Sequence, residues 1–580
     1  MRLIITEKPS VAKTIAQALG KYQYKEDYYQ VGDYKITWAY GHLLTLKMPE
    51  DYDEKYKLWR LDDLPIIPKR FEYKPISKDH KKRLDTIKKL WKEADIVYCA
   101  TDAGREGELI FRLIQQYVGI KKPIKRVWLQ TLTPAGIKDA IDKAKDIKHY
   151  DNLYQAGLQR SLADWVVGIN LTRAVTIKQP GKQVYSIGRV QTPTLAIIVR
   201  REREISKFSS KTSYRPILEF DDFELKCEKT FPTEAEALQF VKPIHEVQLT
   251  FTTKQTKDAP ALLPSLANLQ KEMPWKAKKT LDTLQSLYEK QLVSYPRTDS
   301  NYLPEDMPSQ VQQITSLLGD STDKQYATKP YDPKRIYDNS KVSDHYAVIP
   351  LAKPGTLTDD EKQLFEYVTK RFLSAFYPPA VNTVQTISCE YKGVKFSTQR
   401  VSTKEPSWYK HFPDKIKSDK FMPKRDTATV VGTKVEKVKT NPPPRWTDST
   451  LIDAMEHAGR FIDEKNLKDA IRDKGIGTPA TRADIIERLI NVGYVERNKR
   501  ALVPTDKGMI LIQWLEQQGM DELTKPELTA EWEDRLEQIA VGKEQSDKFL
   551  TDIIQWTNQL ISRANAKLRS QSQPNKQRSR

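Results

Sequence analysis

Two short apolar runs near the start of the chain each lead into a polar turn and then into a helical pattern. Such runs are typical of buried strands, and apolar residues three and four apart are typical of helices that pack on a sheet. The strand, turn and helix are expected at residues 3–6, 7–10 and 11–19 in the first unit, and at 95–100, 101–108 and 109–117 in the second. Strands that alternate with helices in this way indicate an open α/β sheet.

The periodicity changes further along the chain. Helical patterns cover residues 151–174 and a later stretch that runs to about residue 203. Alternating apolar and polar positions, typical of half-buried strands, occupy residues 208–256 and return at residues 380–438. The helical segment between them indicates one β-rich domain built from two discontinuous parts. We therefore expect a multidomain fold that combines α/β, α and β regions.

The helical insert, residues 258–379, contains a helical pattern at residues 280–292 and then Tyr295, Pro296 and Arg297. Proline disfavours helical geometry at the residue before it, so we expect the helix to end here with Tyr295 at its exit. A phenol close to a guanidinium suits attack on a phosphodiester, with the tyrosine oxygen as nucleophile and the arginine stabilising phosphoryl charge. The alternative is that Tyr295 is an ordinary half-buried packing residue.

Acidic residues occupy both turns of the predicted α/β sheet. Glu7 lies in the first turn, and Asp102 and Glu106 lie in the second. Because the carboxyl ends of parallel strands meet at one crevice, we expect these side chains to share it. Clustered carboxylates repel one another unless a hard cation such as Mg²⁺ neutralises them. The alternative is that these acidic residues only cap the helices that follow them. Capping alone does not explain why a basic residue, Lys8 or Arg105, lies beside the acidic residues in each turn.

Composition limits the class of protein. A chain of 580 residues is too long for one core and should form roughly three to five domains. Hydrophobic residues make up 38% of it, and no apolar run approaches the roughly eighteen residues that cross a bilayer. The first residues reach a Glu-Lys pair after a short apolar run, which favours a strand over a signal peptide. We expect a cytoplasmic protein without membrane contact.

The charge of the chain favours nucleic acid as its partner. The formal net charge is +19, which on a large chain suits a polyanion, although a solubilising surface excess is the alternative. The three cysteines are far apart in the sequence, so neither a zinc site nor a disulfide framework is expected. No Gly-x-x-x-x-Gly-Lys-Ser/Thr motif occurs, so we expect no ATP-binding P-loop.

Several motifs together resemble one family. Glu-Lys-Pro-Ser at residues 7–10 and Thr-Asp-Ala-Gly-Arg-Glu-Gly-Glu at residues 101–108 are similar to the TOPRIM domain of type IA DNA topoisomerases, in particular the bacterial topoisomerase III branch. The second motif of the family is often Asp-x-Asp-x-Glu, and here Gly104 stands at its middle position. The resemblance therefore implies a single Mg²⁺ on Asp102 with Glu7 or Glu106 instead of a two-metal site.

Other motifs follow in the order of that family. Ser-x-Gly-Arg-Val-Gln-Thr-Pro at residues 186–193 is similar to a segment of its DNA groove, residues 343–350 resemble the motif that places His345 near the phosphate, and residues 475–482 match a further signature. By this resemblance Trp59 would stack on a base of single-stranded DNA, because an aromatic face can stack on any base. The alternative is that Trp59 is a half-buried tryptophan that braces a loop. The implied DNA-binding residues are Trp59, Trp165, Arg173, Ser186, Ile187, Gly188, Arg189, Val190, Gln191 and Arg297.

The resemblance implies a toroidal core. Its expected segments are residues 1–150 (TOPRIM domain), 151–207 and 441–562 (two segments of a helical DNA-binding domain), 208–257 and 380–440 (two segments of a β-rich arch), 258–379 (catalytic tyrosine domain) and 563–580 (basic disordered tail). The C-terminal zinc modules of many members are not expected here. We expect a monomer that is associated with the nucleoid in the cytoplasm.

The activity implied is ATP-independent transfer of a DNA strand to Tyr295 as a 5′-phosphotyrosine, followed by strand passage and religation. Arg297 and His345 would stabilise the phosphate, Lys8 would donate to the leaving oxygen, and Glu7 would shuttle a proton. The expected substrates are single-stranded, negatively supercoiled or catenated DNA. A TOPRIM-type Mg²⁺-dependent nuclease or primase would share the acidic turns without the tyrosine. A single-strand DNA-binding protein would share only the charge and the aromatic residues.

Overall fold

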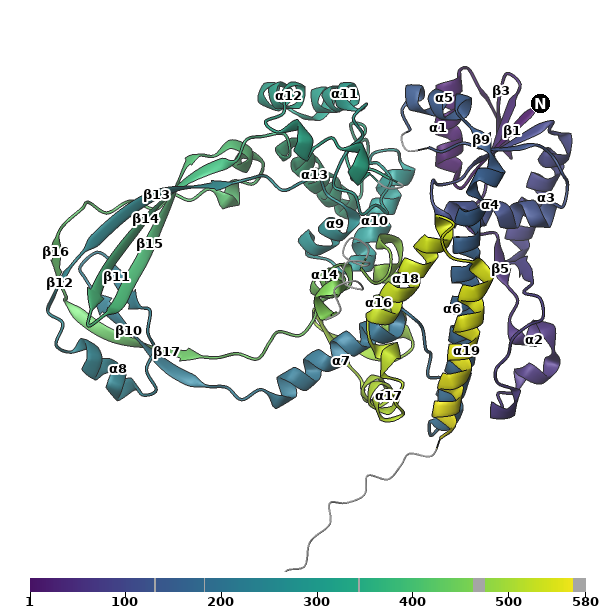
Figure 1. Ribbon diagram of the computed structural model, residues 1–580. Coiled ribbons are helices and arrows are strands. Elements are labelled where there is room, and N and C mark those ends of the chain that lie inside the picture. Colours follow the sequence, from purple (N-terminus) through teal and green to yellow (C-terminus); the bar gives the residue numbers. More distant parts are fainter. Residues whose placement is uncertain (130–131, 182, 343–344, 463–474, 567–580) are drawn as a thin grey trace, which may run out of the picture.

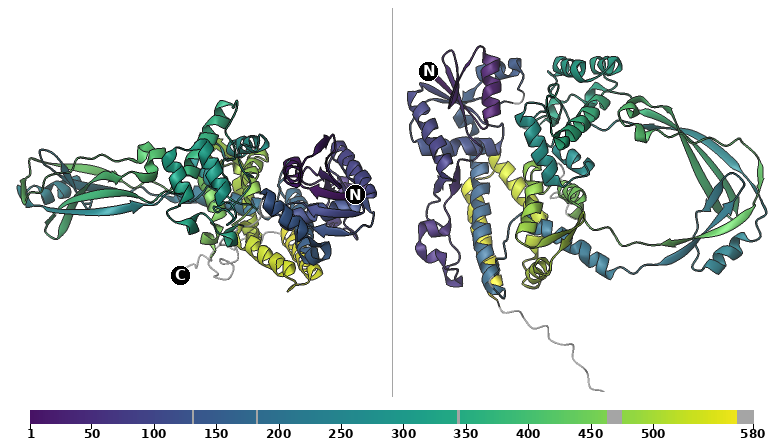
Figure 2. Two further views of the ribbon diagram at one scale, coloured as in Figure 1. Left: turned by 90° about the horizontal axis from the view of Figure 1, so that it is seen from above. Right: turned by 180° about the vertical axis from the view of Figure 1, so that it is seen from behind.

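The computed structural model describes residues 1–129, 132–181, 183–342, 345–462 and 475–566. Its elements form a ring (Figure 1). A long β-sheet lies at one end of the ring, and the N-terminal α/β sheet and the longest helices lie beyond the other end. Two connections join the long sheet to the remainder, one through the helical insert and one through the helix that begins at Gln191, as the reverse view confirms (Figure 2).

The N-terminal sheet of the described residues has the strand order β2-β3-β4-β1-β7-β8-β9. Its strands are β1 (Arg2–Thr6), β2 (Gln23–Lys25), β3 (Tyr28–Val31), β4 (Tyr34–Trp38), β7 (Ile96–Ala100), β8 (Ile124–Arg126) and β9 (Lys145–Asp146). The strands predicted at residues 3–6 and 95–100 are confirmed as β1 and β7. These two strands pair in parallel with Thr6 level with Ala100, so the segments that follow them leave the sheet at the same edge.

Helices cover both faces of this sheet. Alternate residues of β1 point to opposite faces, as the period of a strand requires. Ile4 packs with α1 (Pro9–Leu19) and α5 (Pro134–Asp142), whereas Leu3 and Ile5 pack with α3 (Lys78–Glu93) and α4 (Arg105–Val118). A short helix α2 (Pro49–Tyr52) and the two-stranded sheet of β5 (Leu44–Leu46) and β6 (Tyr73–Pro75) lie between the motifs.

Helix α4 begins four residues earlier than the predicted residue 109, and so Arg105 and Glu106 belong to its first turn instead of to the preceding loop. The reason is a close approach at Gly107. A Cβ added there would meet the backbone oxygen of Asp102 at 2.2 Å, so the absent side chain lets the helix start directly against the loop. The carboxylate of Glu106 is thereby fixed by helical geometry.

The helical base contains elements from two distant parts of the chain. The predicted helices are confirmed as α6 (Asp151–Lys178) and α7 (Gln191–Lys207), and α6 packs lengthwise against α19 (Figure 1). The C-terminal elements are α14 (Asp448–Glu456), α16 (Pro479–Asn491), β18 (Val495–Asn498), β19 (Ala501–Pro504), α17 (Asp506–Gln517), α18 (Glu527–Ala540) and α19 (Ser546–Asn565).

The predicted start of the basic tail was wrong by a few residues. Arg563 lies in the last turn of α19, where its Nη1 donates to Glu522 at 2.8 Å, so this ion pair extends the helix beyond residue 562. Residues 567–580, which carry the rest of that prediction, lie outside the described residues. Among the described residues, no helix is both long and apolar enough to span a membrane.

The two β-rich stretches form one six-stranded sheet within the described residues, in the order β13-β14-β15-β11-β10-β17. Its strands are β10 (Thr212–Glu219), β11 (Glu224–Cys227), β13 (Thr250–Asp258), β14 (Ala380–Tyr391), β15 (Val394–Glu405) and β17 (Gly432–Lys439); β12 (Glu246–Gln248) pairs with β16 (Thr427–Thr429), and α8 is Glu234–Val241. Strand β13 pairs antiparallel with β14, and β10 with β17. The chain therefore leaves this sheet after β13 and returns to it at β14.

The insert between those strands consists of helices α9 (Leu266–Glu272), α10 (Ala277–Glu289), α11 (Pro308–Leu318), α12 (Ser321–Thr328) and α13 (Asp359–Ser374). The helix predicted at residues 280–292 is present as α10, but it ends earlier than predicted, at Glu289. Gln291 adopts a left-handed φ of 59°, and the amide of Leu292 turns back to donate to the carbonyl of Leu287 at 3.0 Å. Tyr295 therefore lies well past the end of the helix, outside any helix or strand.

Candidate active site

The segment that carries Tyr295 is fixed to the segment that carries His345. Ser294 donates its amide to the carbonyl of Ile349 at 2.9 Å, and its hydroxyl donates to the carbonyl of Ala347 at 2.9 Å. The hydroxyl of Thr298 donates to the carbonyl of His345 at 2.9 Å. These bonds on both sides of Tyr295 bring its ring and the His345 ring to a centroid distance of 4.0 Å.

The acidic turns of the N-terminal sheet meet around Lys8. Because β1 and β7 end at the same edge, Glu7 and Lys8 come beside Asp102. Lys8 Nζ lies 2.6 Å from Asp102 Oδ2 and 3.1 Å from Glu7 Oε1. The ammonium therefore forms a bridge between the two carboxylates.

The Tyr295 segment and the acidic turns come together although they lie in different parts of the fold. Lys8 Nζ lies 4.1 Å from the centre of the Tyr295 ring, and His345 Nε2 lies 3.3 Å from Asp102 Oδ2. The structure therefore groups Tyr295, His345, Lys8, Glu7 and Asp102 as the sequence predicted. It adds that the lysine and histidine contact both the phenol ring and the acidic turn.

Burial sets the protonation of this group. It raises the pKa of Glu7, and the charge on Asp102 raises it further. Burial opposes the charge on Lys8, but Asp102 and Glu7 outweigh it and raise the pKa of the lysine well above its usual value. Burial disfavours the Asp102 carboxylate too, yet Lys8 and His345 hold its pKa well below the usual range. Burial also raises the pKa of Tyr295, against an opposing effect of Lys8. The site thus combines an ionised Asp102–Lys8 pair with a protonated phenol, and Glu7 is the carboxyl suited to exchange a proton.

A cleft of about 550 Å³ opens onto these groups. Arg297 and Arg160 line it with Tyr295, and Arg297 Nε is buried without a hydrogen-bond partner in the described part of the chain. A buried donor of this kind is costly unless a ligand supplies its acceptor. Glu106 also lines the cleft, where its Oε1 lies 2.5 Å from His42 Nε2. The cleft therefore combines guanidinium donors with acidic groups, as a phosphodiester and a cation would require.

The three carboxylates of the cleft are arranged to hold one magnesium ion through two of them, and not through all three together. Within the residues that the structure describes, Glu7, Asp102 and Glu106 do not form a group of three ligand atoms within 4.8 Å of one another. Mg²⁺ in proteins is often held by one or two carboxylates, with water and phosphate oxygens completing its octahedron. Asp102 with Glu106 or Glu7 can provide that pair.

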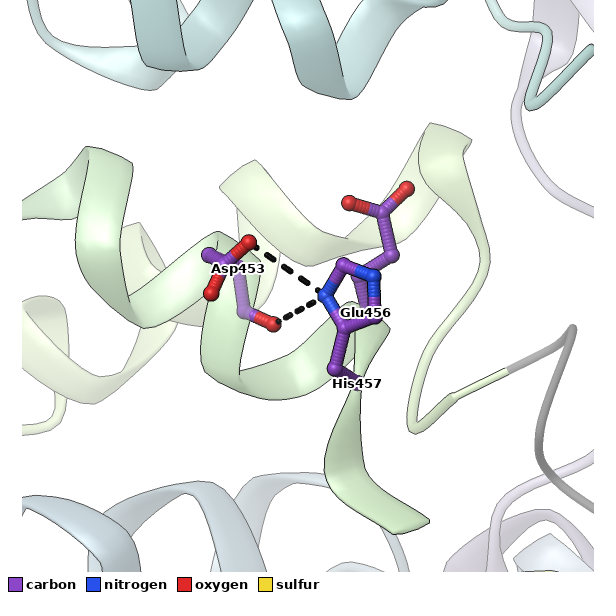
Figure 3. A group of neighbouring side chains, drawn as sticks. All are labelled: Asp453, Glu456 and His457. Carbon is purple, nitrogen blue, oxygen red and sulfur yellow. Dashed lines mark hydrogen bonds and ion pairs between the residues drawn. The ribbon is translucent and has the colours of Figure 1, made fainter. Parts of the chain in front are cut away.

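A group of three such ligands does occur elsewhere, at the end of α14. Asp453, Glu456 and His457 lie side by side there (Figure 3). Lys271 Nζ lies 3.0 Å from Asp453 and 2.5 Å from Glu456, and Arg460 lies 3.3 Å from Asp453. Because protein cations already compensate these carboxylates, the group is explained as an ion-pair network that ties α14 to Lys271.

Part of the predicted DNA-binding set lines a second cleft, of about 620 Å³, along α6. Its walls include Trp59, Trp165, Arg173, Ser186 and Ile187. Trp59 is 37% exposed, and the Arg173 guanidinium lies 5.1 Å from the centre of its ring. An exposed indole beside a cation is a suitable surface for stacking a base.

The remaining members of that set lie elsewhere. Arg189 is buried and pairs with Asp164 at 3.1 Å and Glu533 at 3.2 Å, so its guanidinium is engaged by the protein. Gln191 is also buried and accepts from Arg488 at 3.0 Å. Val190 is half-buried, and a Cβ at Gly188 would meet only Gln191 Cβ at 3.5 Å, so protein packing does not demand a glycine there. The structure thus gives Arg189 and Gln191 protein partners instead of a free surface.

Sequence reasoning missed the residues that hold the acidic turn in place. Glu108 and Arg126 form a fully buried ion pair at 2.9 Å, and Arg126 also donates to the carbonyls of Thr101 at 2.8 Å and Asp102 at 2.7 Å. Glu108 belongs to the acidic motif, which was the available signal. Arg126 lies on another strand and carries no motif, so only the fold connects it to the site. Tyr288 and Arg160 were missed for the same reason.

Comparison with known proteins agrees with this geometry. The profile of the Toprim domain matches residues 2–132, and that of the family described as DNA topoisomerase matches residues 148–551. DNA topoisomerase 3 of Staphylococcus aureus, in strains NCTC 8325 / PS 47 and USA300, is 37% identical over 97% of this chain and 81% of its own length.

The fold has a solved counterpart. The structure of full-length topoisomerase I from Thermotoga maritima superposes with a TM-score of 0.73 over 97% of this chain and 91% of that one, at 24% identity. Family profiles, relatives and fold agree along nearly the whole sequence, and the chain therefore belongs to the type IA DNA topoisomerases, with bacterial DNA topoisomerase 3 among its relatives.

Proposed function

We propose that this topoisomerase cleaves one DNA strand by attack of the Tyr295 oxygen on a backbone phosphate, forming a 5′-phosphotyrosine and releasing a 3′-hydroxyl. The observation that supports the proposal is the contact of the Tyr295 ring, in the helical insert, with Lys8 of the first acidic turn and with His345. The reaction exchanges one phosphoester for another, so its energy balance requires no ATP.

The charges of the site assign roles to its residues. The tyrosine must lose a proton when it attacks, and the 3′ oxygen must gain one to leave as a hydroxyl. Glu7, whose pKa is raised, is the proposed relay that accepts the first proton and returns one to the 3′ oxygen. Arg297, which lines the cleft and whose buried Nε has no hydrogen-bond partner among the described residues, stabilises the phosphoryl oxygens together with His345. Lys8 carries the positive charge that stabilises the developing phenolate and the leaving oxygen. When bound at Asp102 with Glu106 or Glu7, Mg²⁺ would supply positive charge that keeps the DNA ends near one another.

We further propose that the insert at residues 258–379 is the gate of the ring. Separation of its Tyr295 segment from the acidic turns would part the cleaved ends and let a second strand through, which leads to relaxation of negative supercoils and decatenation. The exposed Trp59 beside Arg173 supports single-stranded DNA as the bound form. A monomer acting on cytoplasmic DNA suffices for this cycle.

Trapping of the covalent intermediate tests the mechanism. The protein is incubated with Mg²⁺ and a single-stranded oligonucleotide labelled at its 3′ end, then quenched with SDS. Label attached to wild-type protein and absent from Tyr295→Phe is expected, because only the downstream fragment stays on a 5′-phosphotyrosine. The variant should still bind the oligonucleotide.

The same assay distinguishes the alternative. Cleavage without protein-bound label would favour a TOPRIM-type nuclease, and label that persists in Tyr295→Phe would refute the assignment of the nucleophile. Chelation of the cation with EDTA, followed by restoration with Mg²⁺, then measures which step depends on the metal.

A further inference from the structure

A hydrogen bond next to the active site joins the two parts that the proposed gate must separate. Ser10 is the second residue of α1, directly after the Glu7–Lys8 turn, and Tyr288 is the second-last residue of α10. Ser10 Oγ and the Tyr288 hydroxyl lie 2.8 Å apart. The start of α1 has no side-chain capping bond, although a serine near a helix start often provides one. The Ser10 hydroxyl instead bonds to α10, across the interface.

This contact differs in chemistry from its neighbours. The contacts of Lys8 with Tyr295 and of His345 with Asp102 involve groups that take part in the reaction. The bond between Ser10 and Tyr288 involves two neutral hydroxyls whose protonation does not change during the cycle. Tyr288 is only 9% exposed, so its hydroxyl needs a partner when the interface is closed.

Two clefts border the interface around this bond. The active-site cleft occupies about 550 Å³ of it, and a second cleft of about 550 Å³ lies between the α5 region and residues such as Pro304 and Asn339. Among the described residues, this bond lies beside the contacts of Lys8 with Tyr295 and of His345 with Asp102, so its loss removes one of a group of polar contacts between the two parts. A neutral hydrogen bond contributes only about 1 kcal/mol of net stability. Such a bond breaks readily, as a contact that opens in each cycle requires.

Tyr288 also contacts the nucleophile. Its ring packs edge-on against Tyr295, with centroids 5.5 Å apart and planes at 78°. The Tyr295 ring also contacts His345 and Lys8. A shift of Tyr288 away from Ser10 therefore changes the packing of the attacking ring.

We propose that Ser10 and Tyr288 form a latch that holds the gate closed, and that Tyr288 is a positioning residue for Tyr295. The inference rests on the proposed function, because it is the gate that the latch closes. Loss of the latch increases the open fraction of the gate, and it slows attack by Tyr295 without weakening the binding of DNA, since the cleft at Trp59 lies outside this contact.

The test is a measurement of gate opening by single-molecule fluorescence transfer. The native cysteines are buried, so cysteines introduced at the exposed positions Lys138 on α5 and Gln313 on α11 accept dyes selectively. These helices lie on opposite sides of the interface (Figure 1). In Tyr288→Phe and in Ser10→Ala we expect the ratio of open to closed molecules to rise about fivefold, the change that corresponds to about 1 kcal/mol.

A double-mutant cycle and a matched control make the result specific. Because either variant removes the same bond, the double variant should open no more than each single one. Tyr154→Phe is the control: Tyr154 is also 9% exposed, and its hydroxyl also has a partner at 2.8 Å, Gln116, but this bond does not cross the interface. We expect no change in the open fraction of this variant.

Adduct formation on the labelled oligonucleotide provides the second measurement. In Tyr288→Phe the maximal rate of adduct formation should fall severalfold while the half-saturating DNA concentration stays unchanged. Open fractions equal to wild type in both single variants, or additive effects in the double variant, would overturn the latch. Failure of wild type to form any adduct would overturn the proposed function instead, so the two failures are distinguishable.

Discussion

Lys8 contacts three of the proposed active-site residues, and the motif that contains it predicts only one of them as a neighbour. The sequence identifies it as a neighbour of Glu7, and the family resemblance adds a role as donor. The fold adds that its ammonium lies between two carboxylates and 4.1 Å from the centre of the Tyr295 ring. That position depends on a contact between two residues from distant parts of the chain, which no local pattern encodes.

Replacement of Lys8 by methionine should therefore slow cleavage. Methionine preserves much of the aliphatic length, but it removes the charge that lowers the pKa of Tyr295 against the effect of burial. We expect the rate of adduct formation to fall about 100-fold, a usual cost of losing one electrostatic donor. The pKa of Tyr295 should rise further, so the rate should increase with pH over a higher range than in wild type. Quenched adduct assays across neutral and alkaline pH measure both effects.

Lys35→Met is a matched control for that variant. Lys35 Nζ also lies 2.6 Å from a carboxylate, that of Glu93, and its side chain is 18% exposed against 20% for Lys8. Its pair lies away from the active-site cleft. Equal reductions of activity in the two variants would contradict a specific role for Lys8.

Helix α18 contributes to the site although its sequence contains no motif. Glu533 on this helix pairs with Arg105 at 2.7 Å, at the start of α4, and with Arg189 at 3.2 Å. Burial disfavours its charge, yet Arg189, Arg160 and Arg105 lower the pKa of Glu533 to about 2. One glutamate thus orders arginines from three distant segments beside the cleft.

The pairing predicts a pH-dependent contribution of Glu533 to stability. Its folded-state pKa lies below the ordinary value of about 4.5, so the contribution is fully present above that pH and is lost as the pH falls towards 2. At pH 7, Glu533→Gln should lower the free energy of unfolding by about 3 kcal/mol, because it leaves buried guanidiniums without their counter-ion. Urea unfolding, followed by tryptophan fluorescence, measures this value.

The difference between wild type and Glu533→Gln should then shrink as the pH is lowered from about 5 towards about 2. Glu531, exposed on the same helix, provides the control, and its change to glutamine should have little effect at any pH. A difference that is constant with pH would mean that the carboxylate charge is not the cause.

Across the whole molecule, the sequence predicted which helices and strands exist better than it predicted the residues at which they begin and end. The strands at β1 and β7 and the split β-rich region follow from local periodicity, and the site residues follow from motifs that lie on these elements. The end of α10 was missed because a left-handed Gln291 terminates it, whereas glycine is the usual signal. The ring itself, and the contact of Ser10 with Tyr288 between the N-terminal part and the helical insert, depend on tertiary contacts that periodicity does not describe.

The net charge of +19 acts on the molecule as a whole, and residues 567–580 contribute to it with five basic and no acidic side chains. Truncation after Ala566 should therefore weaken non-specific binding of single-stranded DNA and reduce its dependence on salt. Removal of one phosphate-binding charge lowers the slope of log Kobs against log salt by about 0.7, so the slope should fall by up to about 3.5.

The rate of adduct formation at saturating DNA should be unchanged by the truncation, because the proposed catalytic groups that line the active-site cleft all precede residue 567. A full-length variant with these basic residues replaced by glutamine separates charge from length, and it should reproduce the reduced slope. A slope that stays at the wild-type value in both variants would contradict a contact between these basic side chains and the DNA. It would leave the arginines that line the clefts at Trp59 and Tyr295 as the proposed electrostatic contacts.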